Sequence, residues 1–281
     1  MRLDLVDVFG AAPFRGNPLG VVHGAEALSG EQMLQLTRWL GFSETTFLLP
    51  PTDPAADYRV RIFYPAGELP FAGHPTLGSC HAWLEAGGVP RAKGAIVQEC
   101  PAGLIEIRRD SDMLAFEAPA LTRTGPLSEE ELAEACRVAG VEARLVVEAV
   151  HVANGPRWQM LRLASVEELL VAEPAARAPV GTDVGLVAAY EDGAPLQWEL
   201  RAFFADGYGK VREDPVTGSF NAGVAMQLFG SGLAQGSYLA GQGQKTGADG
   251  RIHCSQDASG AVWVGGRVAT IARGASLPVF S

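Results

Sequence analysis

Apolar and polar residues alternate in many short stretches of the chain, as expected for strands that bury one face. The clearest is residues 58–64, Tyr-Arg-Val-Arg-Ile-Phe-Tyr, in which basic and apolar side chains take turns. Similar runs predict further strands at 3–9, 45–49, 94–99, 104–108, 113–117, 145–152, 158–163, 184–190, 197–204, 251–255, 261–264 and 268–272. Strands therefore dominate the predicted structure.

Three surface helices are predicted from their N-terminal signals. In each, a serine hydroxyl can accept from the amide three residues on, and the Gln or Glu at that position can reach back to the serine. The pairs are Ser29 with Gln32, Ser128 with Glu131 and Ser165 with Glu168. Gly41 and Gly140 follow the first two helices, where a left-handed residue commonly ends a helix.

Two further stretches, 75–84 and 218–229, have helix-compatible sequences without any charged residue. A helix with no charged face is expected to be surrounded by protein. Each follows a Gly/Pro turn that carries one titratable side chain, His74 or Asp214. The repetition predicts two similar lobes, each with a buried helix, whose N-termini meet where the lobes face and offer backbone N–H groups to an anion.

The fold class expected from these patterns is α+β, with two pseudo-symmetric lobes that each wrap a mixed or antiparallel sheet round a central helix. A Pro- and Thr-rich segment at 119–126 is the expected linker between lobe one (1–118) and lobe two (127–270). For the tail, 271–281, two alternatives stay open: disorder, or a return to lobe one.

The composition describes a well-buried globular protein, with 47% hydrophobic and 19% charged residues among 281. No apolar run is long enough to span a bilayer, and the N-terminus is typical of a strand rather than a signal peptide, so a cytoplasmic location is expected. The net charge of −10 argues against nucleic-acid binding.

Cysteine and histidine spacing predicts neither a disulfide framework nor a metal site. The four cysteines are scattered and are expected to be reduced and buried, and the five histidines lack metal-ligand spacing. Residues 241–247 only superficially resemble a phosphate-binding loop, so nucleotide binding is not expected. The five tryptophans are expected to pack in the core or between lobes.

Glu44 is predicted to lie on a turn between the helix ending at Gly41 and the strand beginning at 45, flanked by Phe42 and Phe47. A carboxyl among apolar neighbours has a raised pKa and can both donate and accept a proton near neutral pH. The alternative is an ordinary solvated loop glutamate.

His74 and Asp214 have simple structural alternatives. His74 could be a core histidine bonded to a carbonyl, and Asp214 an N-cap aspartate. Their equivalent places in the two repeated stretches favour a shared role, because two such residues at facing helix ends would flank a bound carboxylate.

These motifs together resemble the PhzF-like family of phenazine-biosynthesis isomerases, within the diaminopimelate-epimerase-like fold. The resemblance covers nearly the whole chain and rests on five blocks in order, at 7–18, 43–47, 65–76, 213–219 and 242–253. It implies a cofactor-free isomerase, active as a homodimer, with a small carboxylic acid in the interlobe cleft. The substrate of the name-giving members is trans-2,3-dihydro-3-hydroxyanthranilate.

Site residues are also implied by the resemblance. Glu44 matches the proton-shuttling glutamate, with His74 and Asp214 beside it in the catalytic group. The substrate-binding positions are Ser219, the backbone amides of Gly73 and Gly218, and Asn17. One carboxyl suits this reaction, because a proton leaves one carbon and returns to another on the same face.

Two departures from related proteins affect the interpretation. The related epimerases use two facing cysteines, whereas the equivalent positions here are Ala72 and Asp214, which excludes a two-thiol racemase. The chain also reads Gly-Ala-Asp-Gly at 247–250 where the family often has Gly-Arg-Pro-Ser, so an arginine contact to an anion is missing. Two alternatives remain: a racemase or epimerase of another small amino or hydroxy acid that uses Glu44, and a non-catalytic homologue that binds small acids or a partner.

Overall fold

Contacts divide the chain into two compact units. The computed structural model describes residues 1–278. Unit one contains Met1–Glu117 and the C-terminal stretch that begins at Gly265, and unit two is Ala118–Val264.

These bounds differ from the expected ones in two places. The expected linker belongs to unit two. Its main chain forms isolated β-bridges there, between Arg123 and Ala153 and between Pro126 and Val150. Residues 265–270 belong to unit one, because the last strand runs back into it.

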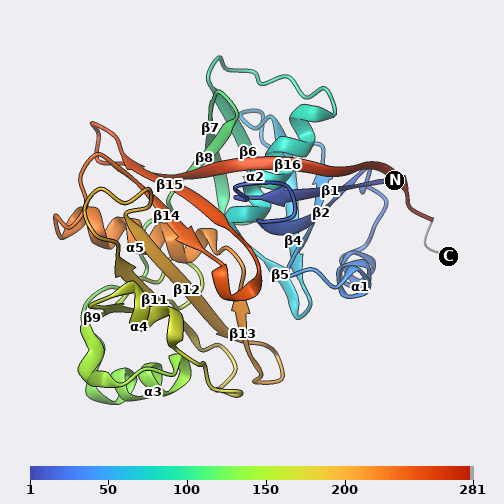
Figure 1. The fold of residues 1–281 in the computed structure, drawn as a ribbon. Helices are drawn as coiled ribbons and strands as arrows, with labels where there is room; N and C mark the ends of the chain where they lie inside the picture. The colour runs from blue at the N-terminus through green and yellow to red at the C-terminus, as the bar shows by residue number, and fades with distance from the viewer. Residues whose placement is uncertain (279–281) are drawn as a thin grey trace. The chain divides into compact units, whose positions relative to one another are not determined.

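Unit one is a sheet closed on itself. Its strands are β1 (Arg2–Val8), β2 (Asn17–His23), β3 (Thr45–Leu49), β4 (Tyr58–Tyr64), β5 (Gly67–Leu69), β6 (Ala95–Cys100), β7 (Gly103–Asp110), β8 (Met113–Glu117) and β16 (Val262–Ser276). The order is β1-β2-β3-β4-β6-β7-β8-β16, and β16 also pairs with β1. In Figure 1, β16 is the long red strand alongside the dark-blue β1.

The helix α2 (Gly73–Glu85) is the buried centre of unit one. It contacts β1, β2, β3, β4, β6 and β8, so the sheet surrounds it. Helix α1 (Gly30–Leu40) instead packs Met33 and Leu36 into a second cluster with Phe47. The prediction of a charge-poor helix enclosed by a sheet is confirmed for this unit.

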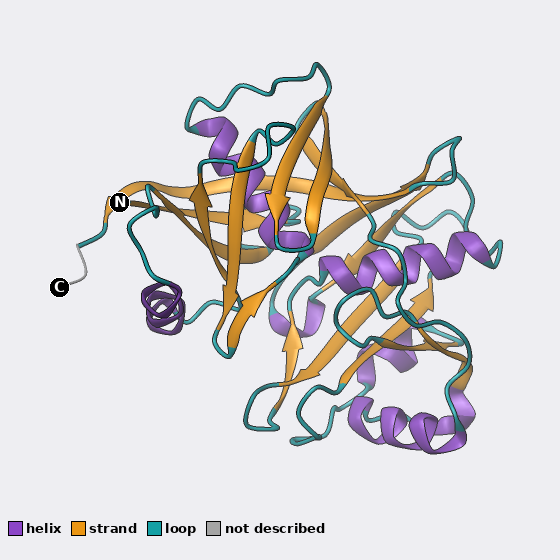
Figure 2. Cartoon of the chain, turned by 180° about the vertical axis from the view of Figure 1, so that it is seen from behind, coloured by secondary structure: helices purple, strands orange, loops and turns teal. Residues whose placement is uncertain are grey.

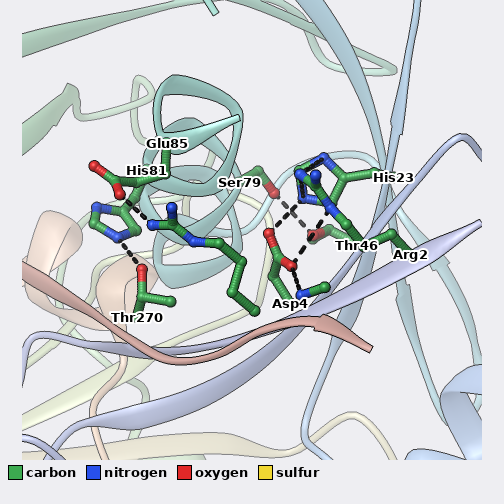
Figure 3. A network of polar contacts seen from close by, with 10 residues as sticks. Arg2, Asp4, His23, Thr46, Ser79, His81, Glu85 and Thr270 are labelled. Atoms are coloured by element: carbon green, nitrogen blue, oxygen red, sulfur yellow. Dashed lines mark hydrogen bonds and ion pairs between the residues drawn. The ribbon is translucent and has the colours of Figure 1, made fainter. Parts of the chain in front are cut away.

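Polar contacts tie the strands and α2 of unit one together (Figure 3). The buried Asp4 of β1 accepts from the amide of Gly274 on β16 at 2.7 Å, and its other oxygen lies 2.9 Å from Nε2 of His23 on β2. Ser79 of α2 donates to Thr46 of β3 at 2.9 Å. These bonds link three neighbouring strands and fix the helix against the sheet.

Unit two is an open mixed sheet with three helices. Its strands are β9 (Val146–His151), β10 (Gln159–Leu163), β11 (Asp183–Ala189), β12 (Trp198–Ala205), β13 (Val211–Asp214), β14 (Ser237–Gln242) and β15 (Gly250–Gln256). The order is β15-β14-β12-β11-β10-β9, with β13 on β12. The helices are α3 (Glu129–Ala139), α4 (Val166–Val171) and α5 (Gly218–Gly230), drawn purple with the others in Figure 2.

Helix α5 is the apolar helix of unit two. Nine of its residues are buried, from Gly218 to Phe229. The sheet and the chain that follows β9 approach it closely. A Cβ on Gly223 would meet the carbonyl oxygen of Val152 at 2.4 Å, and one on Gly185, in β11, would meet the ring of Phe220 at 2.0 Å. Helices α3 and α4 pack on a separate core that contains Leu161, Leu186 and Phe203.

The three predicted surface helices form, and two of them have the full capping box. Both bonds of the capping box are present at Ser29 and at Ser128, and Gly41 and Gly140 end those helices in left-handed conformation. Ser165 accepts from the Glu168 amide at the start of α4.

The strand prediction misses β2, β5, β13 and β14 and divides one strand in two. Glycines 265 and 266 interrupt the apolar pattern, yet they lie within the continuous β16. A Cβ on Gly265 would meet the carbonyl oxygen of Leu114 at 2.6 Å, so close strand contact rather than a turn requires glycine there.

Two further expectations concern the tryptophans and the C-terminal tail. Trp39 is 79% exposed on α1 and is not a packing residue, although Trp158, Trp198 and Trp263 are buried. The tail continues to pair with β1 as far as Arg2 opposite Ser276, and residues 279–281 lie outside the described part of the chain.

None of the helices within residues 1–278 combines the length and apolar character that crossing a membrane requires.

Candidate active site

Glu44 lies where the sequence places it, on the turn between the C-cap Gly41 of α1 and Thr45, the first residue of β3. Its side chain is 19% exposed, and Oε2 is buried and lies 3.6 Å from Nε2 of His74. The alternative of an ordinary solvated loop glutamate does not fit this placement. A carboxylate oxygen and a ring nitrogen therefore face each other in unit one.

His74 is the second residue of α2, and its side chain is 5% exposed. Burial lowers the pKa of His74 to about 3, because the surrounding protein disfavours the charged imidazolium. The imidazole is neutral at pH 7, so its contact with Glu44 is not a charge pair. A neutral ring can donate or accept a hydrogen bond according to its tautomer.

The first turns of α2 and α5 differ from those of the surface helices. Their N-cap residues, Ala72 and Thr217, make no side-chain bond to the helix amides, and neither first turn contains an acidic residue. Uncapped amides at the start of a helix need partners and carry the positive end of its dipole. Gly73 and Gly218, the first residues of these helices, therefore lie where a bound anion would be stabilised.

Asp214 ends β13 and is not the N-cap of α5, a position that Thr217 occupies. Thr217 donates from Oγ1 to Oδ2 of Asp214 at 2.7 Å. Gln242, at the end of β14, donates to Thr217 Oγ1 at 2.9 Å and accepts from the Thr217 amide at 3.1 Å. Asn221 completes the network by donating to Gln242 Oε1 at 2.8 Å. This chain of donors orients the Asp214 carboxyl as an acceptor.

Ser219 lies in the first turn of α5 and is held by two residues from the connection between β9 and β10. Trp158 donates from its indole nitrogen to Ser219 Oγ at 3.0 Å, and Asn154 donates from Nδ2 to the Ser219 carbonyl at 2.8 Å. Sequence reasoning missed Gln242, Asn154 and Trp158 as site residues. Trp158 was predicted only as the first residue of a strand at 158–163, and its position beside Ser219 depends on a contact between residues 61 positions apart in the chain.

Asn17 and the segment 247–250 were also singled out in the sequence. Asn17 is fully buried at the start of β2, opposite Val8 of β1. In the segment 247–250, Asp249 forms an ion pair with Arg251. This arginine therefore already has an acidic partner two residues away in the chain. The structure thus brings Glu44 and His74 together in unit one, and Asp214, Gly218 and Ser219 together in unit two.

A separate hollow of about 470 Å³ lies in unit one, lined by residues that include Met33, Arg59 and Glu99. Its second arginine, Arg61, forms a two-pronged pair with Glu68 at 2.8 and 2.6 Å. Neither Glu44 nor His74 lines it.

Metal-ligating side chains do not gather in the described residues: no group of three or more His, Cys, Asp or Glu is placed to hold an ion.

Comparison with known proteins shows the family of the chain. Residues 6–274 match the family model described as phenazine biosynthesis-like protein, PhzC-PhzF. The chain belongs to this family. Among its relatives, the trans-2,3-dihydro-3-hydroxyanthranilate isomerase of Pseudomonas chlororaphis is 33% identical over 80% of this chain and 78% of its own. The antisense-enhancing sequence 1 protein of Schizosaccharomyces pombe is 33% identical over 96% of this chain and 97% of its own.

Solved structures establish the fold of this family member. A PhzF-family protein of Bacillus anthracis superimposes with a TM-score of 0.81 at 21% identity, over 99% of each chain. A protein of Agrobacterium radiobacter described as a probable proline racemase gives a TM-score of 0.60 at 13% identity over 99% of this chain and 93% of its own. The expected diaminopimelate-epimerase-like α+β fold is confirmed.

Proposed function

We propose that the protein is a cofactor-independent isomerase that moves a proton between two carbons of a small carboxylic acid resembling trans-2,3-dihydro-3-hydroxyanthranilate. The observation that carries the proposal is the contact between Glu44 Oε2 and the neutral ring of His74 at 3.6 Å, at the start of a buried helix. Membership of a family with isomerases among its named members supports it.

In this proposal Glu44 is the single acid–base group. As a carboxylate it removes a proton from a substrate carbon, and as a carboxylic acid it returns that proton to a second carbon on the same face. His74 holds its imidazole beside the carboxyl without adding a charge. Because its pKa is about 3, His74 contributes no titration to the rate profile at neutral pH.

Asp214, Ser219 and the first amides of α2 and α5 are proposed to hold the substrate. The uncapped helix starts would stabilise a carboxylate and the negative charge that develops when carbon loses a proton. The assignment of Asn17, Gly73 and Gly218 as binding residues belongs to the same proposal.

The test is Glu44→Gln, which keeps the size of the side chain and removes its acid–base function. With trans-2,3-dihydro-3-hydroxyanthranilate as substrate, turnover should fall by at least about 10²-fold, while the melting temperature stays within a degree or so. Deuterium incorporation from D₂O into the product reports the proton transfer directly.

The matched control is Glu130→Gln, because Glu130 is an exposed glutamate on α3. This variant should keep full turnover. Wild-type turnover by the Glu44 variant would exclude Glu44 as the proton carrier.

A further inference from the structure

Ser219 Oγ accepts one hydrogen bond whose direction is chemically fixed. The indole N–H of Trp158 can only donate, so the oxygen of the 3.0 Å contact must accept. A hydroxyl has a single proton, which therefore points to some other partner. Within the described residues no acceptor for that proton is found. Ser219 is thus held ready to donate.

The surroundings of Trp158 make this arrangement rigid. The side chain is 3% exposed, and its ring lies 5.1 Å from that of Phe220, the residue after Ser219. The Trp158 carbonyl accepts from the Val152 amide at 2.9 Å, which closes the connection between β9 and β10. Asn154, 7% exposed, holds the Ser219 main chain from the same connection. One segment therefore fixes both the backbone and the hydroxyl of Ser219.

Without the indole donor, the Ser219 hydroxyl could form other hydrogen bonds within the protein. A serine hydroxyl can also bond to neighbouring backbone N–H and C=O groups. The contact with Trp158 occupies a lone pair of Oγ and sets the rotamer, so the proton remains available to a ligand.

We propose that Trp158 is a positioning residue that orients the Ser219 hydroxyl to donate to the carboxylate of the substrate. The inference rests on the proposed role of Ser219 in substrate binding and makes it more specific. The group bound at Ser219 is a hydrogen-bond acceptor with negative charge, rather than an amino group or another donor.

The experiment measures binding of anthranilate (2-aminobenzoate), with aniline as the analogue that lacks the carboxylate, by titration calorimetry. Trp158→Phe keeps a ring against Phe220 and removes the N–H. It should weaken anthranilate binding by roughly 3- to 10-fold, the effect of losing one oriented hydrogen bond. Ser219→Ala should weaken binding by roughly 10-fold.

The double variant separates positioning from general damage. If Trp158 acts through Ser219, Trp158→Phe on the Ser219→Ala background adds less than about two-fold. In turnover, Trp158→Phe should raise KM and leave kcat within about two-fold. Trp198→Phe is the matched control, since Trp198 is 7% exposed in the same unit and packs against Tyr238. It should change neither affinity nor KM.

Three outcomes would overturn the proposal: unchanged affinity in Trp158→Phe, full additivity in the double variant, or wild-type protein that does not prefer anthranilate to aniline. If Trp158→Phe does not fold, benzothienylalanine incorporated at position 158 keeps the ring shape without the N–H, and the same comparisons apply. Wild-type turnover by Glu44→Gln would reject Glu44 as the proton carrier, and no turnover by the wild-type protein would reject the isomerase. With the binding cycle intact, either result leaves this inference standing.

Discussion

Burial determines the protonation of His74 and hence what it contributes beside Glu44. The ring is enclosed at the start of α2, and desolvation holds its pKa at about 3. In the unfolded chain the same group titrates near its ordinary value of 6.5. The difference makes His74 a determinant of stability at acidic pH.

The sign of this effect follows from proton binding. Above pH 6.5 the ring is neutral in both states and has no effect. Between pH 6.5 and about 3 only the unfolded state binds the proton, so stability falls as the pH falls. The loss should approach about 1.4 kcal/mol per pH unit.

Urea unfolding of wild type and His74→Gln between pH 4 and 7 measures this contribution. The variant should show a shallower loss of stability on acidification, because its amide does not titrate. Parallel curves for the two proteins would mean that His74 charges in the folded state.

At the level of single residues, the sequence placed Glu44 on the correct turn, because the Gly41 cap and the start of β3 are local signals. It put His74 beside Glu44 only through the family resemblance, since the contact itself depends on how α1, β3 and α2 pack. Trp158 was missed as a partner of Ser219 for the same reason.

Among the elements, α5 depends on glycine where the chain connecting β9 and β10 crosses it. A Cβ on Gly223 would lie 2.4 Å from the carbonyl oxygen of Val152. Any larger residue there would therefore displace the main chain of Val152 rather than a flexible side chain. Gly223→Ala should lower the free energy of unfolding by about 1–3 kcal/mol.

Gly230 provides the matched control on the same helix, because nothing lies within 4 Å of a Cβ built there. Gly230→Ala should leave the free energy of unfolding unchanged or raise it by up to about 1 kcal/mol. Chemical denaturation of both variants gives the comparison. Equal effects would show that the close approach at Gly223 is not limiting.

Elements with strong local signals were predicted well. The reciprocal capping bonds at Ser29 and Ser128 and the charge-poor sequences of α2 and α5 all correspond to observed features. The missed strands have weaker patterns: β13 is four residues with Val211 as its only apolar position, and β2 contains Pro18 and Gly20. Such strands form because neighbouring strands supply hydrogen bonds.

For the whole molecule, thiol reactivity should be very low in the native state. All four cysteines are buried. Burial raises the pKa of Cys80 and of Cys254 to about 12 and also raises that of Cys100 and Cys136. The thiolate, which is the reactive form, is therefore scarce at pH 8.

Treatment with iodoacetamide at pH 8 should leave native protein unmodified and fully active, whereas all four cysteines should react in urea. Mass spectrometry counts the added groups. Incubation with EDTA should also leave turnover unchanged. Alkylation of native protein with loss of activity would contradict the burial of these thiols.

Local information in the chain was enough for the α+β class, the capped helices, the two charge-poor helices and the family motifs. These features depend on residue spacing within a few turns of chain, which is the range over which periodicity and capping act. Three-dimensional packing decided the remainder. It set the contact of Glu44 with His74, the hydrogen bond from Trp158 to Ser219, and the course of β16, which begins in unit two and continues in unit one. These pairings join residues far apart in the chain, and no local pattern specifies which distant strand or side chain will be the partner.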